Sequence, residues 1–333
     1  MAAFDAKYRG FWVWGAGTVL VLGSFLIFVL AGWPGDVNSC IWGDAGAPKN
    51  ASQLLTPPPR NASKSQAAAY QNTLATIKKN NTCYCEDFSV PDAVSGASGT
   101  RQGVNTWFNL YSIGTSFVVA FGIYLSRRDG SSKLIGSSGL IPDAYIFAVL
   151  FLGLGSMWFH GAMKEWGGIT DTLSMYLFAA FLVFFTIRRR WDSDLFFWLA
   201  YLGTAIGLTI LGEVLAQATN SSLISLFLIL SLVAAYAALE FRLWSKDGTG
   251  SSSQNWWNHF KWWGDDLDTS WRWWAAVGSI LAASAFWKLS QTGQPLCSPG
   301  KFFQPHGLLW HPLAGVMAVF LYFYWRWDIP DTP

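Results

Sequence analysis

Three of the four histidines in the chain occur with residue types that suit metal-dependent chemistry. His160 follows Ser156 by four residues, which places both side chains on one face of a helix. Asp171 comes further along the chain, and His306 and His311 occur together near the C-terminus. Three neutral imidazoles with a carboxylate and an open coordination position suit a zinc ion that activates water. The set predicts a zinc site, with a proton-relay transporter as the next interpretation.

The composition indicates that the elements holding these side chains lie in a membrane. The chain has 333 residues, of which 52% are hydrophobic and 13% are charged. This charged fraction is about half that of a soluble domain, which excludes a disordered chain, a nucleic-acid-binding protein and an ordinary cytosolic enzyme. The formal net charge is only +2, and no run of Lys or Arg is long enough to bind a polyanion.

Eight stretches are long and apolar enough to cross a bilayer, for which a helix needs about 20 residues. We expect them at 11–33, 105–125, 141–162, 169–187, 195–214, 222–243, 271–289 and 307–325. The first stretch is longer than the apolar core of a signal peptide, which usually has about 7–15 residues. We therefore expect an all-α integral membrane protein with a seven-helix transmembrane core and one extra N-terminal transmembrane helix.

Charge in the short loops orients the bundle, because loops rich in Lys and Arg stay in the cytoplasm. The basic residues near span ends fall on one side: Lys7, Arg9, Arg127, Arg128, Arg188, Arg189, Arg190, Arg242, Lys246 and Arg326. The opposite side holds all four cysteines and four N-x-Ser/Thr sequons: Cys40, Cys83, Cys85, Cys297, Asn50, Asn61, Asn80 and Asn220. This distribution indicates an oxidising lumen, so we expect a protein of the endoplasmic reticulum or Golgi with its site towards the lumen.

The predicted segments are a cytoplasmic start and anchor helix at 1–33, a luminal insertion at 34–82, the seven-helix domain at 83–325 and a cytoplasmic tail at 326–333. The insertion is rich in Ala, Ser, Asn and Pro, which favours a flexible, glycosylated segment. We interpret the Trp-rich part of the loop between the sixth and seventh spans as an interfacial aromatic belt.

Ionisable residues inside spans cost about 2.5–3.5 kcal/mol each on insertion scales, so each needs a reason. Under the expected topology all five candidate site residues reach the same depth on the luminal side. Asn105 and Asn109 share one helix face, and we interpret them as structural hydrogen-bonding groups. Glu213 and Glu240 lie at span ends, where we expect solvated or snorkelling carboxylates.

Three segments resemble motifs of the alkaline ceramidase family, which belongs to a superfamily that includes adiponectin-type receptors and GPI-anchor lipid remodelling proteins. The segment 155–160, Gly-Ser-Met-Trp-Phe-His, with Asp171 downstream, resembles the family's Ser-x-x-Phe-His and Asp motif. The segment 304–311 is similar to its Gln-x-His-Ala-x-Trp-His signature. Cys85-Glu86, followed by Asn105-Thr106 and Asn109, resembles the start of its first core helix, so the resemblance covers about 83–325.

The resemblance implies a zinc-dependent amide hydrolase that cleaves ceramide or a related sphingolipid in the bilayer into a sphingoid base and a fatty acid. His160, His306 and His311 would hold zinc, and Asp171 would orient or deprotonate the attacking water. Ser156 would stabilise the developing oxyanion or support the metal shell. Two alternatives stay open: a related lipid esterase such as a GPI-lipid remodelling hydrolase, and a receptor or transporter whose zinc is structural.

The chain departs from the family pattern at the last two histidines. They are four residues apart in the family, whereas His306 and His311 are five apart, which turns them about 140° away from each other on a regular helix. Pro312 offers one solution, because it cannot donate to the carbonyl of Leu308 and so favours a wider bulge. In the other solution, His306 lies just outside the helix and reaches in from the loop.

A second departure concerns the family's calcium site. Glu86 is kept, but Cys83, Phe88 and Gln102 stand where oxygen ligands are expected, so calcium binding is doubtful. The family's disulfide would pair Cys85 with Cys297, which leaves Cys40 with Cys83. A bridge between Cys83 and Cys85 is disfavoured by the very short loop, and a Cys83 to Cys297 pairing stays open.

Overall fold

The computed structural model describes residues 5–41, 58–59, 61–80, 85–131, 133–219, 223–247 and 271–328. Within these ranges the regular secondary structure is helical, and the strand-like pairing found there is one isolated bridge between Val37 and Lys164. The expected all-α class is therefore confirmed.

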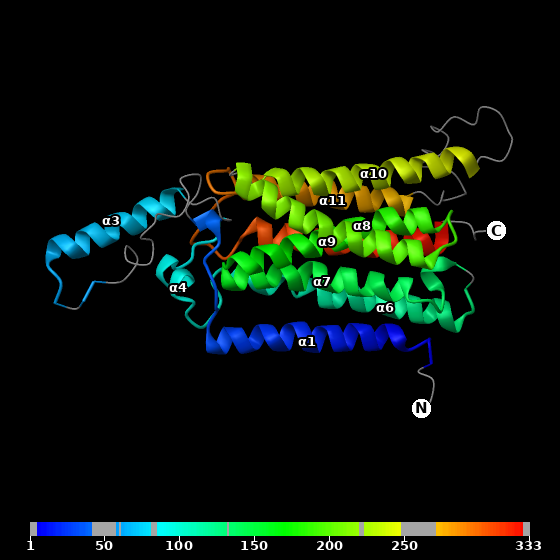
Figure 1. The fold of residues 1–333 in the computed structure, drawn as a ribbon, viewed down its shortest axis with the longest axis horizontal. Coiled ribbons are helices and arrows are strands. Elements are labelled where there is room, and N and C mark those ends of the chain that lie inside the picture. The colour runs from blue at the N-terminus through cyan, green and yellow to red at the C-terminus, as the bar shows by residue number, and fades with distance from the viewer. Residues whose placement is uncertain are drawn as a thin grey trace.

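Long helices run alternately up and down one elongated bundle (Figure 1). Their bounds are α1 Arg9–Ala31, α6 Tyr111–Arg128, α7 Ile141–Ala162, α8 Glu165–Arg188, α9 Asp194–Thr219, α10 Leu223–Asp247, α11 Trp271–Leu289 and α12 His311–Phe323. The shorter helices are α3 Lys64–Asn80, α4 Val90–Ser95 and α5 Gly103–Phe108, with 3₁₀ turns at Ser39–Ile41 and Leu134–Gly136. π-helices precede and follow α12 at His306–Trp310 and Tyr324–Asp328.

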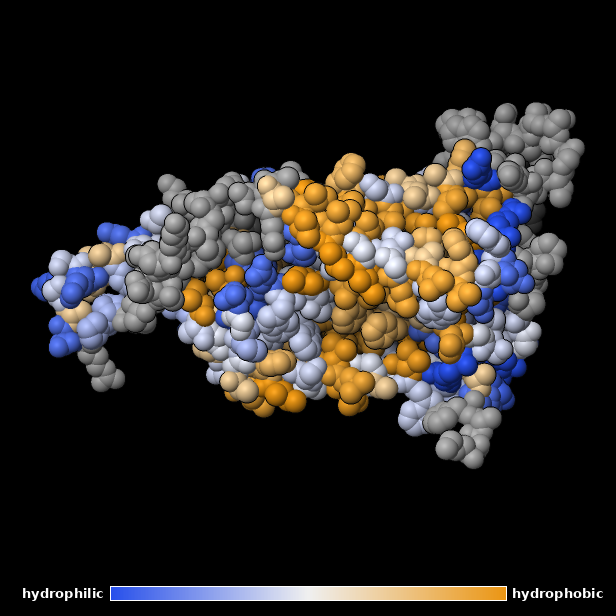
Figure 2. Space-filling view, viewed as in Figure 1, coloured by the Kyte–Doolittle hydropathy of each residue, from blue (hydrophilic) through white to orange (hydrophobic). Residues whose placement is uncertain are grey.

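Seven helical segments of the described chain are long and apolar enough to cross a membrane. They are α1, α5 with α6, α7, α8, α9, α10, and the His306 π-helix with α12. The eighth expected span forms α11, with the predicted bounds, and packs along α12. Its tryptophans and the charged Arg272 and Lys288 make α11 less apolar than the other seven. Apolar residues form a band across the middle of the surface, as expected for a multi-pass membrane protein (Figure 2).

The two ends of the bundle carry different chemistry. We call the end that holds Arg9, Arg127 and Arg189 the arginine end, and the end that holds Cys40 and Cys85 the cysteine end. Helices α3 and α4 lie beyond the membrane-spanning helices at the cysteine end (Figure 1). Because the helices alternate in direction, the basic and cysteine-containing connections separate as the sequence predicts.

Helices α7 and α8 form the centre of the bundle, since most of each apolar span is buried, whereas α1 and α10 lie at its periphery. The core between them is aromatic: Tyr145 packs against Phe181 and Trp325, and Tyr145 donates a 2.7 Å hydrogen bond to the carbonyl of Ala318 on α12. This contact ties the central pair to the helix that follows the last two histidines.

The expectation for Glu240 is wrong, because this carboxylate is fully buried rather than solvated. Arg189 donates to both of its oxygens, at 2.9 and 3.0 Å, and the Tyr324 hydroxyl donates at 3.0 Å. A carboxylate can be buried when its charge is paired and its lone pairs are satisfied. The sequence does not reveal that these groups of α8, α10 and the last π-helix meet.

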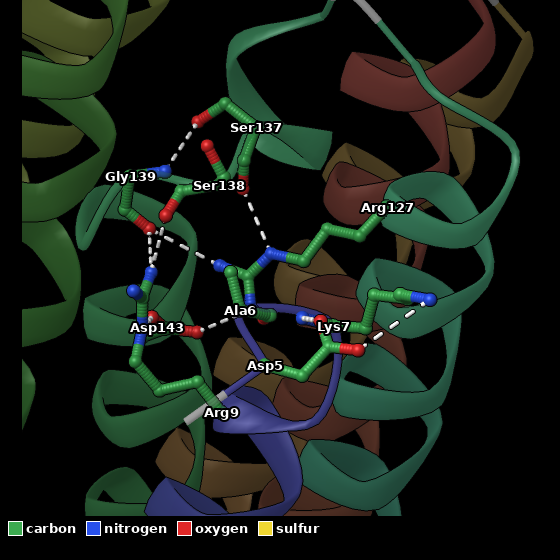
Figure 3. Close-up of polar contacts among 9 residues, drawn as sticks. All are labelled: Asp5, Ala6, Lys7, Arg9, Arg127, Ser137, Ser138, Gly139 and Asp143. Carbon is green, nitrogen blue, oxygen red and sulfur yellow. Dashed lines mark hydrogen bonds and ion pairs between the residues drawn. The ribbon is translucent and has the colours of Figure 1, made fainter. Parts of the chain in front are cut away.

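A second ion-pair network joins α1 to the core at the arginine end (Figure 3). Asp143, at the start of α7, pairs with Arg127 of α6 at 2.9 Å and with Arg9 of α1. Arg127 also donates to the carbonyls of Ser137, at 2.8 Å, and of Ala6, at 2.9 Å. The side chains of Arg127 and Asp143 are almost completely buried, so three helices are held together by one carboxylate.

We expect Asp143→Asn to destabilise the protein strongly, because it leaves the buried guanidinium of Arg127 without its countercharge. Removing one partner of a buried ion pair costs roughly 3–5 kcal/mol. Thermal unfolding in detergent measures the loss. Asp129→Asn, which removes the exposed partner of Arg128, is the matched control and should leave the unfolding temperature unchanged. Equal unfolding temperatures for the two variants would contradict this account of the network.

Candidate metal centre

The cysteine end of α7 carries Ser156 and His160, one turn apart on the same helix. The preceding Gly155 allows α8 to approach closely, since a Cβ atom there would lie 2.7 Å from Cβ of Ser174. Asp171 lies in the second turn of α8, so the close contact between the helices positions it beside Ser156. The two side chains lie close enough for the Ser156 hydroxyl to interact with the Asp171 carboxylate.

The π-helix His306–Trp310 solves the problem of the five-residue spacing. The backbone N–H of His311 donates to the carbonyl of His306, five residues before it, and α12 begins at His311. Pro312 follows directly and has no N–H, so it cannot donate the α-helical hydrogen bond to the carbonyl of Leu308. The wider turn brings the rings of His306 and His311 to a centroid distance of 4.6 Å. The predicted bulge is therefore confirmed, and His306 lies inside the helix.

The three histidines form one buried cluster. His160, His306 and His311 are each at most 3% exposed, and one ring nitrogen from each lies within 4.8 Å of the others. The ring centroids of His160 lie 5.1 Å from His306 and 5.7 Å from His311. Residues 146 positions apart in the sequence thus meet at the expected depth, and the cluster could hold a metal ion.

The nitrogen geometry of the cluster fits a metal such as zinc. Nε2 of His160 and Nε2 of His306 are 3.2 Å apart. Two imidazole nitrogens on a tetrahedral zinc ion, with bonds of about 2.0–2.1 Å, lie about 3.3 Å apart. Nδ1 of His160 is 2.7 Å from the amide oxygen of Gln102, which only accepts hydrogen bonds, so Nδ1 carries the proton. The lone pair of Nε2 then faces the second imidazole, at a distance that suits a shared cation or a hydrogen bond from that ring.

Gln102 orients His160 and is itself fixed on three sides. Its side-chain amide donates to the carbonyl of Glu86 at 3.1 Å, and its backbone N–H donates to the carbonyl of His160 at 3.0 Å. A metal-ligating histidine is usually held by such a partner on its other ring nitrogen. In the sequence, Gln102 stands out only as a departure from the calcium site of the family that the chain resembles. Its contact with His160 could not be predicted, because two segments 58 residues apart must meet to form it.

Two other residues of the first core helices border the cluster. The side-chain amide of Asn109 lies 3.4 Å from Nε2 of His311 and donates to the carbonyl of Asn105 at 2.8 Å. The Tyr111 ring stacks on His311 with a centroid distance of 6.2 Å and interacts electrostatically with Asp171. The structural role expected for Asn109 thus includes a contact with a candidate ligand, whereas Tyr111 was not predicted as a site residue.

Glu86 uses its carboxylate to hold the start of α5. The backbone N–H groups of Val104 and Asn105 donate to its two oxygens at 2.7 and 2.8 Å. The negative charge of a carboxylate at this position is also stabilised by the positive end of the helix dipole. Burial raises the pKa of Glu86, and the two backbone hydrogen bonds oppose that shift. Glu86 thus fixes the helix that begins directly after Gln102.

Asp171 stands apart from the three candidate ligands. Its carboxyl group is buried and paired with the Ser156 hydroxyl, but its oxygens are not among the ligand atoms that lie within 4.8 Å of one another. The structure therefore places the five predicted residues in two adjoining groups. The histidines form a candidate ligand set, and Asp171 with Ser156 forms a polar pair one helical turn from His160.

The disulfide implied by the resemblance is present between Cys85 and Cys297. Cys40 is also disulfide-bonded, and Cys83, the partner expected for it, lies outside the described residues. Among the sequons, Asn61 is exposed beside α3. The side chains of Asn50, Asn80 and Asn220 and the Trp-rich loop lie outside the described part of the chain.

Comparisons of the chain with models of known protein families and with curated proteins give no match.

We expect detergent-purified protein to contain about one zinc ion per chain, and we expect His160→Ala, His306→Ala and His311→Ala each to lose it. Elemental analysis measures the metal content. His259→Ala removes the fourth histidine, in the predicted loop between the sixth and seventh spans, and should retain the metal. A folded His306→Ala protein with full metal content would show that the π-helix does not create a ligand.

Gln102→Leu should weaken metal binding, because it removes the acceptor that fixes the proton and the orientation of the His160 ring. Loss of such an outer partner typically costs about 10–100-fold in metal affinity. Competition with a chromophoric chelator measures the dissociation constant. Gln102→Glu keeps an oxygen acceptor and should bind more tightly than Gln102→Leu. Unchanged affinity in the leucine variant would contradict the orienting role.

Proposed function

We propose that this protein is a zinc-dependent membrane hydrolase that cleaves the amide bond of ceramide or a related sphingolipid, releasing a sphingoid base and a fatty acid. The observation that carries the proposal is the buried group of three histidines at one end of a transmembrane bundle, with a carboxyl and hydroxyl pair beside it. The resemblance of these same residues to the alkaline ceramidase motifs supports the choice of substrate.

The donor set suits zinc. Three imidazole nitrogens are one of the ligand sets of catalytic zinc sites, which keep a fourth position open. When bound, zinc activates a water molecule near neutral pH and polarises a carbonyl group. His160, His306 and His311 would hold the ion, with Gln102 fixing the tautomer of His160.

The residues beside the histidines account for the proton transfers of amide hydrolysis. Asp171 would accept a proton as water oxygen adds to the amide carbonyl carbon. As the C–N bond breaks, the proton would pass to the departing nitrogen, giving a free amine and a carboxylic acid. Ser156, paired with Asp171, would donate a hydrogen bond to the carbonyl oxygen as negative charge develops on it.

The location of the site favours a lipid substrate. The histidines lie near the ends of membrane-spanning helices, and the amide of a sphingolipid lies where its apolar chains join its polar head. The disulfide and the exposed Asn61 occur at the same end. We therefore propose that this end faces the lumen of the endoplasmic reticulum or Golgi, where disulfides form and sequons are glycosylated.

Incubation of the purified protein with ceramide and with an ester lipid of the same chain lengths tests the activity and its bond preference. We expect release of fatty acid from the amide, and Asp171→Asn should lower kcat by about 10²–10⁴-fold while retaining the metal. Glu213→Gln removes a half-buried carboxylate at the same end and should keep full activity. Preferred cleavage of the ester would indicate a lipid esterase, and recovery of both lipids intact from metal-loaded protein would indicate a receptor or transporter.

A further inference from the structure

Helix α1 lies outside the predicted seven-helix domain, yet one of its side chains is completely buried. Most of its surface is open, as expected for an anchor: Ile27 is 63% exposed and Leu30 is 81% exposed. Phe25, in contrast, is 0% exposed. A simple membrane anchor has no need of a buried aromatic ring, so the contacts of Phe25 indicate what else the helix does.

The Phe25 ring packs on the residue that directly follows His160. A Cβ atom on Gly161 would lie 2.6 and 2.8 Å from two ring carbons of Phe25, so the ring occupies the space where any side chain at 161 would stand. On its other side Phe25 meets Trp107 of α5 edge-on, with a centroid distance of 5.9 Å. Phe25 thus fills the angle between the end of α7 and the start of the first core helix.

The C-terminal end of α1 also binds the segment that leads to Gln102. The N–H of Trp33 donates to the carbonyl of Gly96 at 2.7 Å, and the N–H of Gly99 donates to the carbonyl of Val29 at 2.7 Å. The indole of Trp33 donates to the carbonyl of Gly99 at 2.6 Å. Gly32 has a φ of 101°, and a Cβ atom there would lie 2.6 Å from the oxygen of Gly96, so only glycine permits this contact.

We call residues 96–102 the strap, and its far end is joined to α7 at the metal centre. The N–H of Arg101 donates to the carbonyl of Gly161, and the N–H of Gln102 donates to that of His160, both at 3.0 Å. The Arg101 guanidinium donates to the carbonyls of Ala97 and Ser98, which keeps the strap folded on itself. Two routes therefore run from α1 to His160: one through the Phe25 ring and one through the strap.

We propose that α1 is a positioning element of the metal centre, in which Phe25, packed on Gly161, sets the orientation of His160 towards the other two histidines. This inference rests on the proposed metal site and assigns to the extra N-terminal helix a role beyond anchoring. The ion pair of Arg9 with Asp143 fixes the opposite end of α1 to α7 (Figure 3), so the helix is held at both ends along the same neighbour. Phe25 is a positioning residue, because it acts on the metal only through Gly161 and His160.

Cobalt-loaded protein tests the proposal, since the visible spectrum of Co²⁺ reports ligand geometry and its transfer to a chelator reports the rate of metal loss. We expect Phe25→Ala to alter the spectrum and to speed metal loss about 10-fold or more, as for loss of an outer-shell partner. The matched control is Ile27→Ala, on the same helix, whose side chain is 63% exposed. Identical spectra and rates for the two variants would overturn the proposal.

A second pair of variants separates positioning from folding. Gly161→Ala introduces a methyl group against the Phe25 ring and should disturb the cobalt spectrum, and Phe25→Leu in the same chain should restore it by removing ring atoms. Failure of the leucine to restore the spectrum, in protein with an intact thermal transition, would overturn the role of Phe25. Wild-type protein that binds no metal would overturn the proposed function together with this inference. If the wild type binds metal and Phe25→Ala has the same cobalt spectrum and rate of metal loss, only the inference is overturned.

Discussion

The double link between Gln102 and His160 is the interaction on which the arrangement of the site depends. The backbone of Gln102 holds the last turn of α7, and its side chain holds the ring of the histidine in that turn. Glu86 and the strap are joined to His160 through this junction, whereas Phe25 of α1 contacts the next residue, Gly161. In an apolar bundle, dispersion contacts alone leave ring rotation weakly specified, so directional hydrogen bonds are needed to aim an imidazole.

The two ends of the molecule solve different physical problems. At the arginine end, buried carboxylates such as Asp143 and Glu240 each collect partners from several helices and fix how those helices pack. At the cysteine end, a disulfide, a capped helix start and glycine contacts fix short segments outside the spans. Charged groups occur at both ends, since the cysteine end also holds the Arg101–Asp92 ion pair and the buried Glu86 and Asp171. What distinguishes the cysteine end is the disulfide and the three-histidine cluster.

The sequence predicted the fold well, because the hydrocarbon thickness of a bilayer sets the length of an apolar run that crosses it. The spans, the separation of cysteines from arginines and the convergence of His160, His306 and His311 all follow from such runs. The burial of Glu240 did not follow, because it depends on which groups of neighbouring helices the carboxylate meets. Gln102 and Phe25 were missed for the same reason: their partners are distant in sequence, and no spacing rule brings a loop glutamine or an N-terminal ring to a histidine.

The Cys85 to Cys297 bond joins residues 212 positions apart. It closes a covalent ring that contains α4 to α11 and leaves out both α1 and α12, which carry Phe25 and His311. During synthesis the chain emerges from its N-terminus, so α1 is available from the beginning, whereas the ring can close only after α11 has been made and inserted. Assembly of a complete coordination sphere is then necessarily one of the last events in biogenesis. A chain interrupted before its final helix would lack His306 and His311, two of the three candidate ligands.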